Sequence, residues 1–391
     1  MTRGTGEIVM LVAASVRSGR RRLTLGGLAL AMVFGVAACS GGAAPVAAPD
    51  GKSAAPNSGS SAAAPSVAGA KELTGAGATF PYPLYSKWFD VYSQKFGVRI
   101  NYQSVGSGAG IQQITQKTVD FGASDAPMSD DQIKAAGGDI LHIPATMGPA
   151  VVIYNIDGVE KGLKLTPETL SGIFLGTITK WNNPKVVADN SGVKLPATDI
   201  ATVHRSDGSG TSNIFTDYLS TVSPDWKSKV GMGTSVNWPN GLGAKGNEGV
   251  AGQVKQTPGS IGYVELAYAV QNKLTFALVK NAAGQFVEAS LDSTAAAAAG
   301  AASKMPEDLR VSIVNAPGEK SYPICGYTYL LVYKNQTDGA KAKALVDFLW
   351  WGIHDGEQYA KDLMYAPLPA EVVTKAEAKI NSISFQGKPL R

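Results

Sequence analysis

Short runs of apolar and β-branched residues alternate along the chain with segments whose apolar residues recur at helical spacing. The pattern predicts strands at 98–102, 151–154 and 201–203, and helices at 109–117 and 212–221. Strands that alternate with helices are typical of proteins in which helices cover a largely parallel sheet. The chain is therefore predicted to have an α/β fold.

The clearest helix is predicted over residues 82–96, with a proline in its first turn. Its large apolar residues fall at helical spacing, so we interpret them as core residues; they are Leu84, Trp88, Val91, Tyr92 and Phe96. A second stretch, 293–304, is rich in alanine and contains no proline. It predicts a surface helix, to which we assign no function.

The first 38 residues have the pattern of an export signal. Arginines at 20–22 precede the uncharged apolar run Leu23–Ala38, which is shorter than the roughly 20 residues of a membrane span. The run ends in Val36-Ala37-Ala38-Cys39, a lipobox pattern that favours cleavage before a lipidated Cys39. We therefore predict a signal peptide over 1–38 and a lipid anchor on the extracytoplasmic face of the cell membrane. An ordinary signal peptide without lipidation stays an alternative. The sequence also leaves open which export route the chain takes and where translation starts.

Composition and charge characterise the chain beyond the signal peptide. Residues 39–70 are almost entirely Gly, Ala, Pro and Ser, which predicts a flexible tether. About 320 residues remain, a length typical of two compact domains. Residues 1–38 hold five of the 35 Lys and Arg and one of the 31 Asp and Glu, so the mature chain has a net charge near zero. Nucleic-acid binding is therefore not expected, and any anion must be held by a local site.

Cysteine and histidine are too few and too scattered for metal or disulfide chemistry. With Cys39 lipidated, Cys325 is the remaining cysteine, so no intrachain disulfide is expected. The histidines at 142, 204 and 354 lack metal-ligand spacing, so no metal is expected. Each histidine is interpreted as a surface or half-buried side chain.

Three glycine-rich turns with hydroxyl residues each precede a predicted helix: Gly75–Phe80, Gly106–Gly110 and Asp207–Ser212. The unpaired N–H groups of a helix start attract anions, glycine lets an oxyanion approach the backbone, and Ser or Thr adds a hydroxyl donor. Each turn alone fits an ordinary helix cap. Three of them, together with Arg205, favour an anion site.

The same turns do not match the motifs of common enzymes. Gly106–Gly110 lacks the last glycine of G-x-G-x-x-G, and Ser107 and Ser209 do not lie in G-x-S-x-G; a further glycine-rich segment, Gly241–Gly246, lacks the order of a P-loop. We therefore assign no catalytic residue and expect no enzyme.

Over nearly all of residues 72–391 the chain resembles the PstS family, the phosphate-binding proteins of Pst phosphate ABC transporters. The blocks that carry the resemblance are Thr74–Pro81, Val119–Pro127, Arg205–Ser212, Trp238–Pro239 with Gly241–Asn247, and Gly259–Glu265. The resemblance implies a periplasmic-binding-protein type II fold, in which a two-strand hinge joins two α/β lobes. One lobe would comprise 71–150 plus 323–391, and the other 151–322.

The resemblance also implies a phosphate site, whose residues match Thr79, Phe80, Ser107, Asp125, Arg205, Ser209, Gly210 and Thr211. Asp207 would orient the Arg205 guanidinium, although a turn-forming aspartate is the alternative. The family's frequent GSSGG turn is Gly106-Ser107-Gly108-Ala109-Gly110 here, which puts a secondary contact in doubt.

Asp125 is unusual in an anion site and makes sense only if the ligand brings a proton, as phosphate does and sulfate does not. Together with this interpretation of Asp125, the resemblance implies a monomeric receptor, without a cofactor, that delivers inorganic phosphate to membrane permease subunits served by a cytoplasmic ATPase. A receptor for another oxyanion, a phosphoryl-transfer enzyme, and a phosphate sensor or adhesin are the alternatives.

Overall fold

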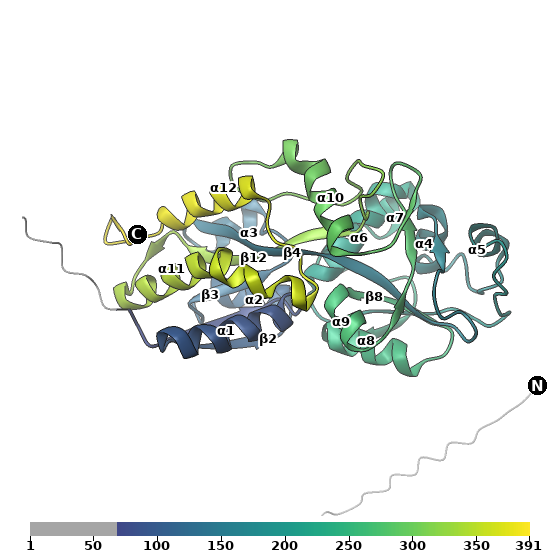
Figure 1. Ribbon diagram of the computed structural model, residues 1–391, viewed down its shortest axis with the longest axis horizontal. Helices are drawn as coiled ribbons and strands as arrows, with labels where there is room; N and C mark the ends of the chain where they lie inside the picture. The colour runs from purple at the N-terminus through teal and green to yellow at the C-terminus, as the bar shows by residue number, and fades with distance from the viewer. Residues whose placement is uncertain (1–68) are drawn as a thin grey trace, which may run out of the picture. The chain divides into compact units, whose positions relative to one another are not determined.

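The structure, a computed structural model, describes residues 69–391 (Figure 1). The predicted signal peptide, Cys39 and all but the last two residues of the predicted tether lie outside the described residues. In the described part, the strands form one nine-stranded sheet and two three-stranded sheets. No helix in this part is long and apolar enough to cross a membrane.

The large sheet has the strand order β2-β1-β3-β12-β4-β8-β6-β7, and β9 also pairs with β4. The strands are β1 (Glu72–Gly77), β2 (Arg99–Ser104), β3 (Phe121–Ser124), β4 (Ile140–Asn155), β6 (Ala201–Arg205), β7 (Leu242–Ala244), β8 (Ser260–Glu265), β9 (Thr275–Phe276) and β12 (Cys325–Tyr333). Strand β1 is parallel to β2 and β3, and β6 is parallel to β7 and β8. The carboxyl ends of each parallel set therefore lie at one edge.

Strand β4 joins two groups of strands. Residues 140–149 pair with β12, whereas residues 150–155 pair with β8, both antiparallel. We call β1, β2, β3 and β12 the first strand group, and β6, β7, β8 and β9 the second strand group. Figure 1 shows β4 running from the first group, on the left, into the second group, on the right.

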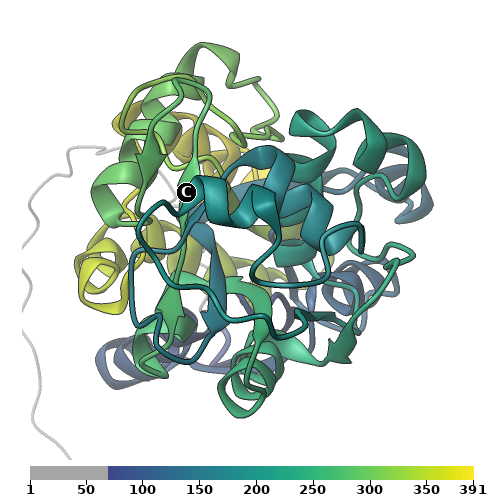
Figure 2. The ribbon, with the colours of Figure 1, turned by 90° about the vertical axis from the view of Figure 1, so that its right-hand side faces the viewer.

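Helices surround the strands, as the end-on view in Figure 2 shows. Those that flank the first group are α1 (Tyr82–Phe96), α2 (Ser107–Thr115), α3 (Asp130–Ala135), α11 (Gly339–Ile353) and α12 (Ala370–Asn381). Those in the chain segment of the second group are α4 (Pro167–Phe174), α5 (Pro184–Asp189), α6 (Gly210–Val222), α7 (Pro224–Lys229), α8 (Gly246–Gln256), α9 (Leu266–Gln271) and α10 (Leu291–Ala301).

The remaining elements are short. One small sheet contains β5 (Lys164–Leu165), β10 (Leu278–Lys280) and β11 (Phe286–Val287), and the other contains β13 (Asn335–Gln336), β14 (Ser384–Phe385) and β15 (Lys388–Pro389). Three 3₁₀ turns span Ala302–Lys304, Asp355–Tyr359 and Lys361–Leu363. The mixture of a large sheet with covering helices confirms the α/β prediction.

Helix α1 has the predicted bounds, and its end is set by a glycine. Gly97 has a φ of 67°, a left-handed conformation that ends the helix with its N–H on the Ser93 carbonyl. Leu84, Trp88 and Tyr92 are buried as predicted. The assignment of Phe96 to the core is wrong: it is 48% exposed at the last position of the helix, where its ring lies beside Tyr92 and Trp351.

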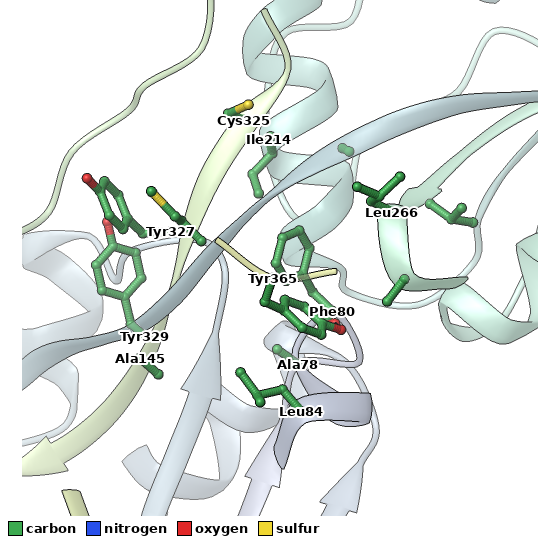
Figure 3. Packing of buried hydrophobic residues seen from close by; sticks show 14 of the residues in the cluster. Ala78, Phe80, Leu84, Ala145, Ile214, Leu266, Cys325, Tyr327, Tyr329 and Tyr365 are labelled. Carbon is green, nitrogen blue, oxygen red and sulfur yellow. The ribbon is translucent and has the colours of Figure 1, made fainter. Parts of the chain in front are cut away.

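Three other predictions concern buried positions. Helix α10 is not simply a surface helix, because Ala297, Ala298 and Ala301 are buried. The prediction of a surface or half-buried side chain is wrong for His142, which is buried and whose Nε2 accepts a hydrogen bond from the Met128 N–H at 2.9 Å. Burial lowers its pKa to about 4, so the ring is neutral. Cys325 is a free, buried thiol on β12 (Figure 3), and burial raises its pKa to about 12.

Trp88 provides a test of this core. It is fully buried, and its indole N–H donates to the Gly356 carbonyl at 2.8 Å. Trp88→Ala should lower the free energy of unfolding by about 3–5 kcal/mol, because it leaves a cavity. Phe96→Ala, the control in the same helix, should lower it by less than about 1 kcal/mol. Urea denaturation measures both, and equal losses would contradict the difference in burial between the two side chains.

Candidate anion-binding site

The predicted site residues lie just beyond the carboxyl ends of parallel strands, where ligands of open α/β sheets bind. Thr79 follows β1, Ser107 begins α2 after β2, and Asp125 directly follows β3. Arg205 is the last residue of β6 in the second strand group. The two groups meet at this point, since the Gly108 N–H donates to the Gly208 carbonyl at 2.9 Å.

Every predicted anion contact is buried. These residues are Thr79, Phe80, Ser107, Asp125, Arg205, Ser209, Gly210 and Thr211. Members from the two strand groups lie close together, because Gly210 sits against Ser107 and Asp125. A buried polar group needs hydrogen-bond partners, so each partner restricts what the group can still bind.

Arg205 is held by a bidentate ion pair. Its Nε and Nη2 donate to the two carboxylate oxygens of Asp207 at 2.8 and 2.5 Å. The Gly246 N–H also donates to Asp207, at 3.0 Å. Burial alone would raise the pKa of Asp207, but the bonds and charge of Arg205 and the Gly246 N–H hold it below its usual value. Asp207 is therefore a charged partner that fixes the guanidinium and leaves Nη1 available.

Asp125 has the opposite electrostatic environment. Its Oδ1 accepts the Thr328 hydroxyl at 2.8 Å, and its N–H donates to the Ser107 hydroxyl at 3.2 Å. Burial raises the pKa of Asp125 to about 7, although Thr328, Arg205 and Ser107 oppose that rise. Near neutral pH this carboxyl group is thus both an acceptor and a donor.

Gly210 is close to Asp125 and lacks room for a side chain. A Cβ at this position would lie 2.5 Å from Ser107 Oγ and 2.6 Å from Asp125 Oδ2. Helix α6 begins at Gly210, and Ser209 caps it by accepting the Ser212 N–H at 3.0 Å. The ordinary cap is therefore present. The N–H groups of Gly210 and Thr211 lie at N1 and N2, where no intrahelical partner exists.

Two tyrosine hydroxyls fix the peptide planes that follow β1. Tyr268 donates to the Thr79 carbonyl at 2.5 Å, and Tyr365 donates to the Phe80 carbonyl at 2.6 Å. In a trans peptide the C=O and the next N–H point in opposite directions, so the Phe80 N–H is directed away from Tyr268. The ring of Phe80 packs beside Tyr365 in the core, as Figure 3 shows.

Asn247 links Thr79 and Thr211, which belong to segments far apart in the sequence. Its amide nitrogen lies 2.7 Å from Thr79 Oγ1 and 3.2 Å from Thr211 Oγ1. Its amide oxygen accepts the Glu265 N–H at 2.9 Å. Asn247 therefore connects the start of α1, the start of α6 and the end of β8.

Sequence reasoning did not assign roles to three residues that contact this set. Asn247 lies in the block Gly241–Asn247, so its position was visible but its contacts were not. No feature of the sequence pointed to the contact between Thr328 and Asp125, because Thr328 lies on β12, 203 residues from Asp125. The Tyr263 hydroxyl accepts the Arg205 N–H at 3.2 Å and bonds to the Ser212 hydroxyl, although the sequence pointed only to the block in which it lies.

The arrangement can hold a small oxyanion. It combines a fixed guanidinium, Ser and Thr hydroxyl groups, and helix-start N–H groups with one carboxyl group able to meet a proton. Among residues 69–391, no three His, Cys, Asp or Glu side chains cluster in a way that could hold a metal ion.

Comparisons with known proteins place the chain in a family. A model of the PBP superfamily domain matches residues 55–350. A phosphate-binding protein from Stenotrophomonas maltophilia of known structure has a TM-score of 0.59 to this chain at 21% identity, over 79% of this chain and 94% of that one. The chain belongs to the PBP superfamily, and the predicted type II fold is confirmed.

Two curated relatives are closer in sequence. The phosphate-binding protein PstS of Xylella fastidiosa strain 9a5c is 48% identical over 78% of this chain and 84% of its own length. PstS of Pasteurella multocida is 47% identical over 82% of this chain and 94% of its own length. Within the superfamily, the chain belongs to the PstS family, as the resemblance predicted.

The raised pKa of Asp125 predicts how stability depends on pH. Folding favours the neutral form of this carboxyl group, so its contribution to stability is present below about pH 4 and is lost as pH rises through about 7. Asp125→Asn, which is always neutral, should therefore gain stability relative to wild type as pH rises from about 4 to about 7, and the difference should level off above that pH. Thermal unfolding without phosphate or sulfate measures this difference.

Asp131→Asn is the matched control, because Asp131 is exposed on α3. Its stability relative to wild type should change little over the same pH range. A pH-independent difference between wild type and Asp125→Asn would contradict the environment described for Asp125.

Proposed function

We propose that this chain is an extracytoplasmic receptor that captures inorganic phosphate and delivers it to an ABC-type phosphate permease. The observation that carries the proposal is that Ser107 at the start of α2 and Gly210 at the start of α6 lie against the buried Asp125, close enough to Arg205 for its charge to act on that carboxyl group. The relatives named phosphate-binding protein PstS support the same ligand. The process is binding and release, without a chemical step.

The proposed contacts supply donors on several sides of the anion. Arg205 binds phosphate oxygens through Nη1, the group that Asp207 leaves available. Hydroxyl groups of Thr79, Ser107, Ser209 and Thr211 and the N–H groups of Phe80, Gly210 and Thr211 provide the remaining bonds. Because the site is buried, these bonds replace the hydration shell of the anion.

Asp125 gives the site its selectivity. Hydrogen phosphate always offers at least one O–H near neutral pH, and the ionised carboxylate accepts it. Sulfate has no proton to offer, so the same carboxylate meets an unprotonated oxygen, which leaves an unpaired acceptor and places two negative groups in contact. Sites that depend on one such hydrogen bond reject the analogue without it by roughly 10⁴–10⁵.

We propose two lobes, 71–150 with 323–391 and 151–322, that close around the anion. The change of β4 partner between Pro149 and Ala150 supports this boundary. Thr79, Phe80, Ser107 and Asp125 belong to one proposed lobe, and Arg205, Ser209, Gly210 and Thr211 to the other. A ligand that contacts both lobes favours the closed form. In this proposal the receptor acts as a monomer, and the permease subunits, which a cytoplasmic ATPase serves, receive its closed form.

Calorimetric titration of phosphate and sulfate into the purified protein tests the proposal. At pH 8 the wild type should bind phosphate tightly and sulfate roughly 10⁴–10⁵-fold more weakly. The ratio of phosphate affinity to sulfate affinity should decrease at pH 5, because Asp125 is then protonated and donates to sulfate. Asp125→Asn should decrease this affinity ratio at both pH values, since the amide N–H can donate to sulfate. Wild-type sulfate binding within about a hundredfold of phosphate at pH 8 would overturn both the ligand and the role of Asp125.

The receptor is also proposed to be anchored through lipid on Cys39. The support is the lipobox Val36-Ala37-Ala38-Cys39 at the end of the apolar run. Cys39→Ala should abolish labelling of the protein by radioactive palmitate in cells, whereas Cys325→Ser, which keeps the lipobox, should leave labelling intact. Unchanged labelling of the Cys39→Ala protein would exclude the anchor.

A further inference from the structure

Asn247 occupies a position that the proposed phosphate contacts do not include. It is the second residue of α8 and is fully buried. Its backbone N–H also points at Thr79 Oγ1, at 3.3 Å, so one hydroxyl receives two bonds from this residue. Gly246, the residue before it, holds Asp207. The start of α8 thus supports both the ion pair and the threonine hydroxyls.

The direction of the Asn247 amide is fixed by chemistry. Its oxygen end faces the N–H of Glu265 at 2.9 Å, and a backbone N–H can only donate. The amide nitrogen therefore lies at the other end, next to both threonine hydroxyls. Its two N–H bonds match these two contacts, one to Thr79 and one to Thr211.

This direction determines where the hydroxyl protons go. A hydroxyl group carries one proton and accepts through its lone pairs. Since Asn247 donates to the oxygen of Thr79 and of Thr211, each hydroxyl must use its own proton elsewhere. Within residues 69–391, neither hydroxyl donates to a protein group. Both protons remain available to a ligand oxygen.

We infer that Asn247 is a positioning residue that occupies lone pairs of Thr79 and Thr211 and so directs their hydroxyl protons to the bound oxyanion, one from each proposed lobe. The inference rests on the proposed function, because the contacts of these two threonines with phosphate are part of that proposal. Asn247 itself does not touch the anion. It acts through the two hydroxyls, which strengthens binding of an acceptor-rich ligand and couples that binding to contact between the lobes.

A thermodynamic cycle tests this role with phosphate as the titrant. The four proteins are wild type, Asn247→Ala, the double variant Thr79→Val with Thr211→Val, and the triple variant. Asn247→Ala should weaken phosphate binding by about ten- to a hundredfold in the wild-type background. In the double-variant background the same change should cost much less, because no hydroxyl remains to be oriented.

Asn190→Ala is the matched control. Asn190 is 2% exposed, and its side chain likewise makes three hydrogen bonds, with Lys164 N, Lys164 O and Val186 O. Its loss should lower stability but leave phosphate affinity within about threefold of wild type. Thermal unfolding confirms that each variant is folded before titration.

The outcomes separate the two proposals. If wild-type protein does not bind phosphate, the proposed function is wrong. If wild type binds phosphate, an Asn247→Ala loss below about threefold, or an equal loss in both backgrounds, overturns the role of Asn247. Asn247→Asp provides a second measurement: it keeps the shape but turns the donor into an acceptor, so it should weaken binding more than Asn247→Ala. An aspartate variant that binds better than the alanine variant would indicate a packing role.

Discussion

A guanidinium group removed from water determines how the surrounding chain is arranged. The side chain of Arg205 is 2% exposed, and a charge so deeply buried is costly unless it is paired and hydrogen-bonded. Asp207 supplies the opposite charge, and the Gly246 N–H holds Asp207, so the loop before α8 must lie against the end of β6. Because α8 starts there, its next residue, Asn247, reaches both threonine hydroxyls. The requirements of one charge thus connect four segments of the chain.

Two aspartates in this region show how environment sets the behaviour of one residue type. Asp207 is only partly buried and bonded to a cation, so its pKa falls. Asp125 is buried, and burial outweighs Thr328, Arg205 and Ser107, so its pKa rises to about 7. Such divergence between neighbouring carboxyl groups separates their roles. Asp207 is a permanent counter-charge, and Asp125 is the group that we propose to distinguish a protonated oxyanion from an unprotonated one.

Local features were predictable from the sequence, and contacts between distant segments were not. Apolar spacing gave the bounds of the helix at 82–96, and Arg205 and Asp207 lie two residues apart, so their pairing was accessible. Periodicity alone misassigned Phe96, because helical spacing shows which residues share a face and not how completely that face is covered. The family resemblance supplied Asp125, but Thr328 reaches it only through the pairing of β12 with β3 and β4. That pairing depends on topology, which no local pattern encodes.

The place of β12 in the sheet also governs the order in which the chain can fold. It lies between β3 and β4, pairing Leu330 with Ala123 on one side and with Ile143 on the other. Until residues 325–333 have been synthesised, β3 and β4 lack their shared neighbour, and their edges stay open to other strands. Insertion of β12 between β3 and β4 then joins positions about 200 residues apart in the sequence. This step is slow, because the long segment between these positions loses conformational entropy. The sheet of a newly synthesised chain therefore stays incomplete until nearly all residues have been made. During this time the chain can bind chaperones or aggregate.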